Sequence, residues 1–476
     1  MILKVLLVEH PKKLWPLFGK GVAQPIHLAC LAAVLEQGGI EVDILDCTVL
    51  GYGWAEYERV LKKTLPDVVG VSGITPFLGS AIKTVQIAKK VNPNVVTVVG
   101  GTHFTLNVRQ SLMDYPDIDY VVVGEGEITL LELVKALNNS KDLYKVKGIA
   151  FRNGKNIEIT LERPLIEDLD ILPMPAYHKL PMNKYRFVIW GGKLCIMVSS
   201  RGCHFKCRFC TEQRIWRNRW RGRSAMKIVD EMELLNKRYG INMVWFGDDN
   251  FNLDRKRNEQ FVEELEQRKL DMKWFIESRV DTILRDADLV QRMSKLGLFY
   301  VLMGAESSSE DDLKYLNKKI NLSQTREAVA LLKKHDIIVQ TNFVVGLPDD
   351  TKKSIRRTIN FAKSLDPDIA IFGPLTPFPG TDLYDELVES GWLEETEFEK
   401  FDFLTPVART HSLSRKQLQG EIFKAYIEFY ARPKKFIRSL LNSNKMARDT
   451  FIHFSRNMST YMVKRFLRNE LSLSPD

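Results

Sequence analysis

Short apolar runs rich in β-branched residues alternate with amphipathic segments along most of this chain, and this alternation limits the folds it can adopt. In the N-terminal part the apolar runs lie at 4–8, 41–45, 68–72, 95–101 and 120–126. Continuous apolar strands that alternate with helices are typical of a parallel sheet covered on both faces. The sequence therefore predicts an α/β fold whose first domain, residues 1–140, is doubly wound and Rossmann-like.

A second alternation spans residues 191–400. Its expected strands lie at 194–199, 242–247, 273–277, 299–304, 337–345 and 369–373, with helices between them. Six βα units in about 200 residues indicate a partial (β/α)6 barrel, since a complete eightfold barrel needs about 250. Residues 141–190 carry a hairpin signal at Asn153-Gly154 and a proline-bearing stretch, and we expect a linker there. Residues 401–476 are expected to be a basic helical region.

The formal net charge of +9 is concentrated near the C-terminus. Residues 415–470 hold 13 Lys and Arg against four Asp and Glu, an excess equal to the whole net charge. One interpretation is a solvated helical face, and the other is a surface for anionic lipid, because Phe and Tyr are interleaved with the cations. No run of eighteen apolar residues and no secretory signal pattern occur, so we expect a cytoplasmic protein, at the inner membrane surface under the second interpretation.

Three of the six cysteines, Cys203, Cys207 and Cys210, lie within eight residues with the spacing C-x-x-x-C-x-x-C. Three thiolates on one loop can bind three irons of a cubane cluster and leave the fourth iron open to a small chelating molecule. A structural zinc with His204 as fourth ligand is the alternative, although zinc sites normally use pairs separated by a longer spacer. The cysteines expected to be small buried hydrophobes are Cys30, Cys47 and Cys195.

The motif C-x-x-x-C-x-Phe-C resembles that of the radical S-adenosylmethionine (radical SAM) family, and the resemblance covers roughly residues 190–390. It implies a 4Fe–4S cluster on the three cysteines, S-adenosylmethionine bound to the open iron, and reductive cleavage to a 5′-deoxyadenosyl radical. An alternative for one of the adjacent aspartates at 248 and 249 is a helix N-cap. The cofactor-binding residues implied by the resemblance are Phe209, Asp248, Asp249, Ser278, Arg279, Glu306 and Gly346.

A doubly wound domain ahead of such a barrel resembles the cobalamin-binding radical SAM subfamily, which includes methyltransferases acting on unactivated carbon and the anaerobic porphyrin ring cyclase. The resemblance implies cobalamin as a third cofactor. The residues it places at the corrinoid and its nucleotide tail are Ser72, Thr75, Gly100, Gly101, Gly124, Glu125 and Gly126.

One departure from that subfamily concerns cobalt. The D-x-H-x-x-G motif, whose His ligates cobalt in many cobalamin domains, is absent, and the loop after the first strand reads Glu9-His10-Pro11-Lys12-Lys13. We expect His10 to be a loop histidine rather than a ligand. Either cobalt takes no His from this domain, or the domain binds no corrinoid; the subfamily favours binding.

The sequence thus predicts a cobalamin-dependent radical SAM enzyme, in the first place a methyltransferase acting on an unactivated carbon. Cyclisation, ring contraction or oxidation with the same cofactors is the alternative. Expected partners are a small-molecule or lipid substrate and an electron donor such as ferredoxin or flavodoxin.

A zinc-stabilised nucleic-acid-binding protein is the alternative of another class, suggested by basic and aromatic residues after the cysteines. These residues are Arg214, Trp216, Arg217, Arg219, Trp220, Arg221 and Arg223. Arginines beside a cluster also suit the carboxylate of the bound cofactor, and we expect no nucleic-acid partner.

Overall fold

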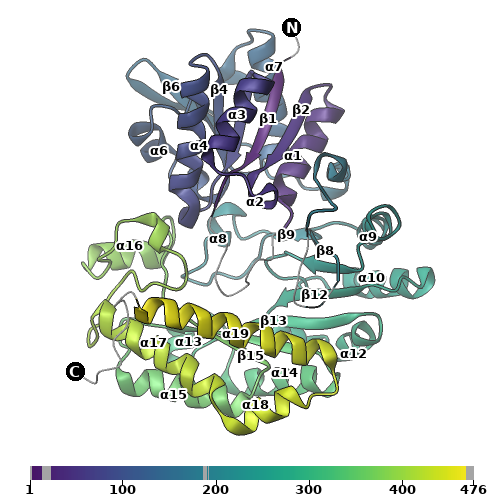
Figure 1. Cartoon of the computed structure of the whole chain (residues 1–476), viewed down its shortest axis with the longest axis vertical. Coiled ribbons are helices and arrows are strands. Elements are labelled where there is room, and N and C mark those ends of the chain that lie inside the picture. Colours follow the sequence, from purple (N-terminus) through teal and green to yellow (C-terminus); the bar gives the residue numbers. More distant parts are fainter. Residues whose placement is uncertain (1–2, 13–22, 186–189, 191, 468–476) are drawn as a thin grey trace. The chain divides into compact units, whose positions relative to one another are not determined.

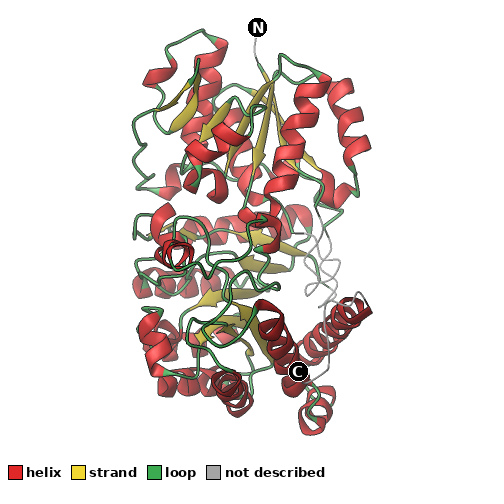
Figure 2. Cartoon of the chain, turned by 90° about the vertical axis from the view of Figure 1, so that its left-hand side faces the viewer, coloured by secondary structure: helices red, strands yellow, loops and turns green. Residues whose placement is uncertain are grey.

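The computed structural model describes residues 3–12, 23–185, 190 and 192–467, and these fall into two compact units (Figure 1). The first unit comprises residues 3–12, 23–185 and 214–217. The second comprises the remaining described residues. In both units the strands lie among helices (Figure 2), and the predicted α/β class is confirmed.

The first unit is built on a seven-stranded sheet with the order β2-β1-β3-β4-β5-β6-β7. Its parallel strands are β1 (Lys4–Glu9), β2 (Glu41–Asp46), β3 (Val68–Ser72), β4 (Val96–Gly100) and β5 (Tyr120–Val122). Its helices are α1 (Ile26–Gln37), α2 (Cys47–Leu50), α3 (Trp54–Thr64), α4 (Leu78–Val91), α5 (Thr102–Leu106), α6 (Val108–Asp114) and α7 (Gly126–Asn138). Helix α1 packs on α7 and α3 packs on α4, as in a doubly wound domain.

The predicted hairpin at Asn153-Gly154 forms, but it belongs to the first unit. Strands β6 (Ile149–Asn153) and β7 (Asn156–Ile159) are antiparallel, and β6 pairs with β5. Ile149 and Ala150 are buried in this sheet, because each lies opposite an apolar β5 residue. Residues up to Tyr185 therefore group with the first unit, where the sequence suggested a linker over 141–190. Positions 186–189 of that stretch lie outside the described residues.

The second unit contains a six-stranded parallel sheet with the order β15-β14-β13-β12-β11-β8. The strands are β8 (Leu194–Met197), β11 (Met243–Phe246), β12 (Lys273–Ser278), β13 (Leu298–Glu306), β14 (Ile338–Val345) and β15 (Ile369–Pro374). The helices before residue 400 are α8 (Glu212–Ile215), α9 (Ala225–Tyr239), α10 (Arg255–Arg268), α11 (Val280–Arg285), α12 (Ala287–Lys295), α13 (Glu310–Tyr315), α14 (Leu322–Lys334), α15 (Lys352–Leu365) and α16 (Asp382–Glu389). Six strands in sequential order match the predicted partial barrel.

The predicted helical C-terminal region is present as α17 (Arg415–Tyr430), α18 (Pro433–Leu440) and α19 (Lys445–Leu467). Its aromatic residues largely serve the core: Phe429 and Phe451 are fully buried, and the Tyr426 hydroxyl accepts a hydrogen bond from the backbone N–H of Phe372 in β15 at 3.1 Å. Within the described part of the chain, no helix combines the length and the apolar content needed to cross a bilayer.

Short 3-10 helices complete both units. They are η1 (Thr75–Phe77), η2 (Leu143–Lys145), η3 (Leu169–Ile171), η4 (Tyr177–Lys179) and η5 (Phe398–Lys400).

Candidate active site

The three motif cysteines lie on a loop at the carboxyl end of β8. The loop runs between β9 (Ser200–Arg201) and α8, and β9 pairs with the short strand β10 (Arg221–Gly222). Gly202 opens the loop with φ +87°, a left-handed conformation that favours glycine. The Cys210 amide donates to the Cys207 carbonyl at 3.0 Å, and this turn draws the last two cysteines together. Cys207 is buried and the other two are half-buried.

Contacts from residues far along the chain hold this loop. The Arg208 amide donates to Leu316 O at 3.1 Å, and the Arg208 guanidinium lies 4.6 Å from the Tyr315 ring and pairs with Glu386. An interaction of this kind orders a long side chain that would otherwise be free. The loop is thereby fixed to α13 and α16.

Cations lie beside the thiols. Arg279, at the end of β12, places Nη1 3.7 Å from Cys207 Sγ and stacks 3.6 Å from the Phe205 ring centroid. Its Nη2 donates to Lys318 O at 2.5 Å. Burial raises the pKa of Cys203, and the nearby Arg279 opposes that rise. A positive neighbour favours the thiolate, which is the form that binds metal.

The same thiols bear on the choice between a cluster and zinc. Among the described residues, no three His, Cys, Asp or Glu side chains converge closely enough to hold one metal ion. A single zinc requires such convergence, whereas the three cysteines of a cubane bind three different irons and stand further apart. The cationic neighbours of the loop suit the negative charge of thiolate ligands.

Glu306 and Lys318 form a buried ion pair next to this loop, with 2.6 Å between Oε1 and Nζ. Burial lowers the pKa of Lys318, but the carboxylate of Glu306 and the thiol of Cys207 outweigh it, so that the pKa is raised. Glu306 has φ +60°, and a Cβ at Gly304 would lie 2.0 Å from its Oε1. Glycine at 304 therefore leaves the space that this pair occupies.

The adjacent aspartates connect the end of β11 to the cysteine loop. Buried Asp248 accepts from Ser199 N at 2.7 Å and from Ser200 Oγ at 2.6 Å, while Asp249 Oδ2 accepts from Gly202 N at 2.8 Å. The helix N-cap suggested for one of them is wrong. Asp254 caps α10 instead, with its Oδ1 3.0 Å from Arg257 N.

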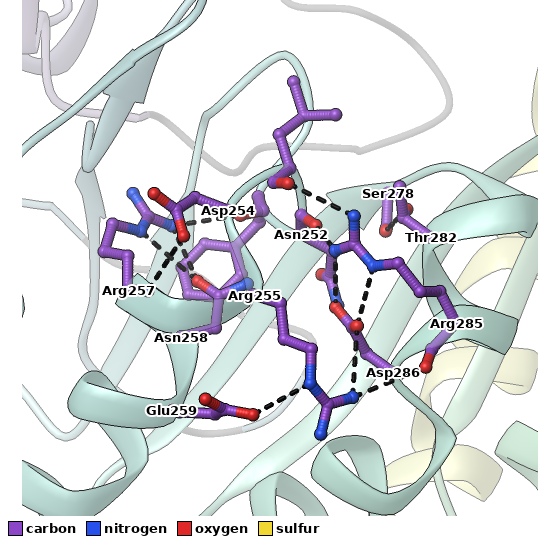
Figure 3. Close-up of polar contacts among 12 residues, drawn as sticks. Asn252, Asp254, Arg255, Arg257, Asn258, Glu259, Ser278, Thr282, Arg285 and Asp286 are labelled. Atoms are coloured by element: carbon purple, nitrogen blue, oxygen red, sulfur yellow. Dashed lines mark hydrogen bonds and ion pairs between the residues drawn. The ribbon is translucent and has the colours of Figure 1, made fainter.

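Two arginines that sequence reasoning missed hold the loop after β11 (Figure 3). Arg257 donates to Ser199 O at 3.1 Å and to Phe251 O at 3.0 Å. Arg285 donates to Asn252 O at 2.5 Å and pairs with buried Asp286. No sequence pattern separates Arg257 from the other basic residues of α10, so only the fold reveals this role.

The second sheet has an inner face whose side chains are half-buried. Alternate strand residues are half-buried, whereas their neighbours pack outward against helices, as Phe246 does on Phe261. Four residues of the half-buried set, at 196, 245, 302 and 371, pack against the hydrophobic core cluster of this unit. The inner-face residues are Ile196, Trp245, Glu277, Leu302, Asn342 and Ile371.

Glu277 is the acidic member of this inner face. Burial raises its pKa to about 7, and the nearby Asp248 carboxylate acts in the same direction. The native state therefore holds the Glu277 proton more tightly than the unfolded state does, and stability falls as the pH rises from about 4.5 to about 7.

Glu277→Gln should remove part of this pH dependence. In chemical denaturation, the wild type should lose about 1–2 kcal/mol more than the variant between mildly acidic and mildly alkaline pH. Glu263→Gln, at an exposed position of α10, is the matched control and should behave as wild type. Parallel curves for the wild type and Glu277→Gln would contradict the assignment.

The remaining predicted residues of this unit lie around the cysteine loop in different ways. Phe209 packs against a cluster that includes Leu347. Gly346 has φ +96°, and its amide donates to Asp350 Oδ2 at 2.8 Å. Ser278 Oγ forms a hydrogen bond with Thr282 Oγ1 at 3.1 Å.

The predicted cobalamin residues of the first unit gather at the carboxyl ends of β3, β4 and β5. Gly101 has φ +93°, and a Cβ there would lie 2.8 Å from Gly73 O and 2.6 Å from Ser72 Oγ. Glycine at 101 therefore lets the turns after β3 and β4 lie close together, where any side chain would collide with the β3 turn. Gly100 precedes Gly101 at the end of β4, and Gly124, with φ +77°, is in open space.

Two of those residues have protein partners. Thr75 Oγ1 lies 3.1 Å from His103 Nδ1, and Glu125 Oε2 accepts from Ile166 N at 2.7 Å. Gly126 begins α7, where a Cβ would lie 3.0 Å from Leu31. His10, which directly follows β1, is buried, and burial lowers its pKa to about 4.

The arginines after the cysteine loop have protein partners. Arg223 pairs with Glu231 at 2.5 Å, Arg217 pairs with Glu162, and Arg221 is buried. Side chains engaged in this way do not favour the nucleic-acid alternative. Of the scattered cysteines, Cys47 and Cys195 are buried as expected and Cys30 is half-buried.

Both units, the doubly wound unit and the partial barrel with three cysteines after its first strand, match known protein families. Residues 197–362 match the radical SAM superfamily, and residues 19–134 match the B12 binding domain. The chain is 34% identical over 441 residues to the uncharacterized methyltransferase PH0819 of Pyrococcus horikoshii, covering 92% of this chain and 95% of that protein. It therefore belongs to the cobalamin-binding radical SAM enzymes.

Other similar proteins agree with this family. The anaerobic magnesium-protoporphyrin IX monomethyl ester cyclase of Rubrivivax gelatinosus is 34% identical over 430 residues, 89% of this chain and 76% of the cyclase. The fold is similar to that of TsrM from Kitasatospora setae, a radical S-adenosylmethionine methyltransferase solved with cobalamin and a [4Fe-4S] cluster. That match has a TM-score of 0.74 and 18% identity, covering 97% of this chain and 100% of TsrM. The predicted family, enzyme class and cofactor set are confirmed at the level of the family.

Proposed function

We propose that this protein is a methyltransferase that uses S-adenosylmethionine, a 4Fe–4S cluster and cobalamin to methylate an unactivated carbon of a small-molecule substrate. The observation that carries this proposal is the cysteine loop at the carboxyl end of β8, with Arg279 Nη1 at 3.7 Å from Cys207 Sγ. When bound, the cluster and cobalamin supply the electron for cleaving S-adenosylmethionine and the methyl group for transfer.

The chain's own residues would hold and orient these groups. Cys203, Cys207 and Cys210 would ligate the cluster, and Arg279 would stabilise its sulfur ligands electrostatically. Phe209 would lie against the adenine, and Asp249 and Glu306 would receive the polar end of S-adenosylmethionine. Asp248 and Ser278, whose polar atoms are occupied within the protein, would act by fixing the strand ends on which the other residues lie.

In the first unit, the glycine turns would receive the corrinoid. Gly124, where a Cβ would meet nothing within 4 Å, supports a binding surface formed by bare backbone, and Gly101 lets the turns after β3 and β4 lie close together. Ser72 and Thr75 would supply hydroxyl groups, and Gly100, Gly124, Glu125 and Gly126 would shape the adjoining turns. His10 is buried directly after β1, and we assign it no ligand role.

The substrate would enter the inner barrel face, whose apolar members surround Glu277. A mostly apolar surface with one acid suits a small organic molecule with a hydrogen-bonding group. Exclusion of water by Trp245, Leu302 and Ile371 would protect a reactive carbon centre from side reactions. The electron donor, such as ferredoxin or flavodoxin, is likewise a proposal.

The test is anaerobic reconstitution with iron, sulfide and hydroxocobalamin. The reconstituted protein is then incubated with reductant, methyl-labelled S-adenosylmethionine and a small-molecule extract. We expect bound corrinoid in the optical spectrum, 5′-deoxyadenosine, and label in a product heavier than its precursor by one methylene. Label confined to S-adenosylmethionine-derived by-products would reject methyl transfer.

Cyclisation or oxidation is the second candidate, and the identity to the magnesium-protoporphyrin ester cyclase favours it. It predicts 5′-deoxyadenosine together with a product that has the same carbon count as its precursor. The mass of the product therefore separates the two candidates.

A further inference from the structure

Helix α18 buries a lysine and exposes apolar residues, although an amphipathic helix normally buries its apolar side. Its buried residue is a lysine, since Lys435 is 4% exposed, whereas Phe436 and Ile437 are 48% and 57% exposed. Leu440 and Leu441 are 38% and 78% exposed. Ile437 and Leu441 are mostly exposed, whereas the Phe436 ring lies 6.0 Å from that of buried Phe451. We call Phe436, Ile437, Leu440 and Leu441 the α18 apolar face.

The lysine accounts for this orientation. Lys435 Nζ donates to Pro367 O at 2.6 Å, lies 3.5 Å from Asp366 Oδ1 and stands 4.8 Å from the Phe429 ring. A buried ammonium needs such partners. Because Lys435 points toward the connection between α15 and β15, the residues on the opposite side of α18 point outward.

Asp366 holds the flanks of the helix as well. Arg432, Arg438 and Lys333 pair with the same carboxylate. The cations lower the pKa of Asp366 against the effect of its burial. One carboxylate surrounded by four cations leaves the base of α18 positively charged.

Positively charged side chains at the edge of the α18 apolar face indicate which kind of partner binds there. Lys434 is exposed, and the Arg438 side chain is 61% exposed. Apolar side chains beside cations fit a surface that is apolar below and anionic above, as an anionic bilayer is. A second copy of this chain would bring the same cations together, and a nucleic acid would leave the apolar side chains uncovered.

We propose that the α18 apolar face is a docking surface for an anionic lipid bilayer. The four apolar side chains enter the boundary between headgroups and acyl chains, while Lys434 and Arg438 contact lipid phosphates. The anchoring of Lys435 keeps the helix in this orientation before it meets the membrane. This surface depends on no cofactor and stands apart from the catalytic proposal.

The test is co-sedimentation of the full chain with vesicles of phosphatidylcholine alone or with about one-third phosphatidylglycerol. We expect association with the anionic vesicles. The triple variant Phe436→Ser, Ile437→Ser, Leu441→Ser should bind them about tenfold or more weakly, because it removes most of the apolar area available for insertion. Its substitutions are at exposed positions, and an unchanged circular dichroism spectrum would verify the fold.

A matched control changes equally exposed apolar residues of the first unit. The triple variant Met113→Ser, Leu161→Ser, Ile171→Ser, at positions 61%, 75% and 60% exposed, should bind as wild type does. Lys434→Glu should weaken binding to the anionic vesicles. Unchanged binding of the α18 variant would overturn the proposal, and so would a dimer in sedimentation velocity that only the α18 variant dissociates.

Discussion

Cys207→Ala is expected to abolish formation of 5′-deoxyadenosine and to lower the iron content of the reconstituted protein. Cys207 is the most buried of the three motif cysteines, and its sulfur is the one that Arg279 approaches. Removing it leaves two thiols, which cannot retain a cubane with one open iron. Anaerobic iron and sulfide analysis and chromatography of the nucleoside product measure the two effects.

Cys195→Ala is the control for this prediction. Cys195 is fully buried in β8, eight residues before the motif, and its thiol donates to Ile196 O at 3.4 Å. Its loss should cost about 1 kcal/mol of stability and leave iron content and nucleoside formation intact. Deoxyadenosine formation by Cys207→Ala at the wild-type rate would refute the cluster assignment.

Glu306→Ala should destabilise the second unit by about 3–5 kcal/mol, because it leaves the Lys318 ammonium buried without its anion. Both side chains are less than one-tenth exposed, and Arg279 lies close enough to add repulsion. Thermal or chemical denaturation measures this loss. The variant should also bind S-adenosylmethionine more weakly in equilibrium dialysis.

A double variant separates the two consequences of removing Glu306. Glu306→Met with Lys318→Met replaces the pair by apolar groups and should recover most of the lost stability. If Glu306 contacts S-adenosylmethionine, the double variant should remain weak in binding. Full recovery of affinity would show that Glu306 only neutralises Lys318, and unchanged stability of Glu306→Ala would contradict the buried pair.

The fold could be predicted because its signals are local. Apolar strand runs such as 68–72 and 337–345 are bounded by turn residues, and each became a strand within one or two residues of the predicted ends. The hairpin turn at Asn153-Gly154 was also predicted from the local sequence. The pairing of this hairpin with β5 could not be predicted, because it depends on contacts between residues far apart in the sequence.

The candidate site could be predicted only in part. The cysteine spacing is a continuous motif, so the loop was found from sequence. The roles of Arg257 and Arg285 depend on carbonyl groups that the fold brings within reach, and no pattern in α10 or α11 reports them. The partner of Glu306 was missed for the same reason, since Lys318 lies on the connection after α13.

The orientation of α18 shows how a tertiary contact overrides composition. The segment 433–441 reads as an amphipathic helix, and burial of its apolar side would be the ordinary expectation. The position of Asp366 at the base of β15 reverses this expectation, because it offers a partner to Lys435 that no apolar residue could use.

The contacts that hold the cysteine loop also set an order of events during biosynthesis. Tyr315 and Glu386 follow Arg208 by 107 and 178 residues. At a translation rate of about 5–20 residues per second, the thiols emerge many seconds before these partners exist. Metal delivered before these partners emerge would meet an unsupported peptide, so the iron–sulfur assembly machinery should act only after α16 has been synthesised.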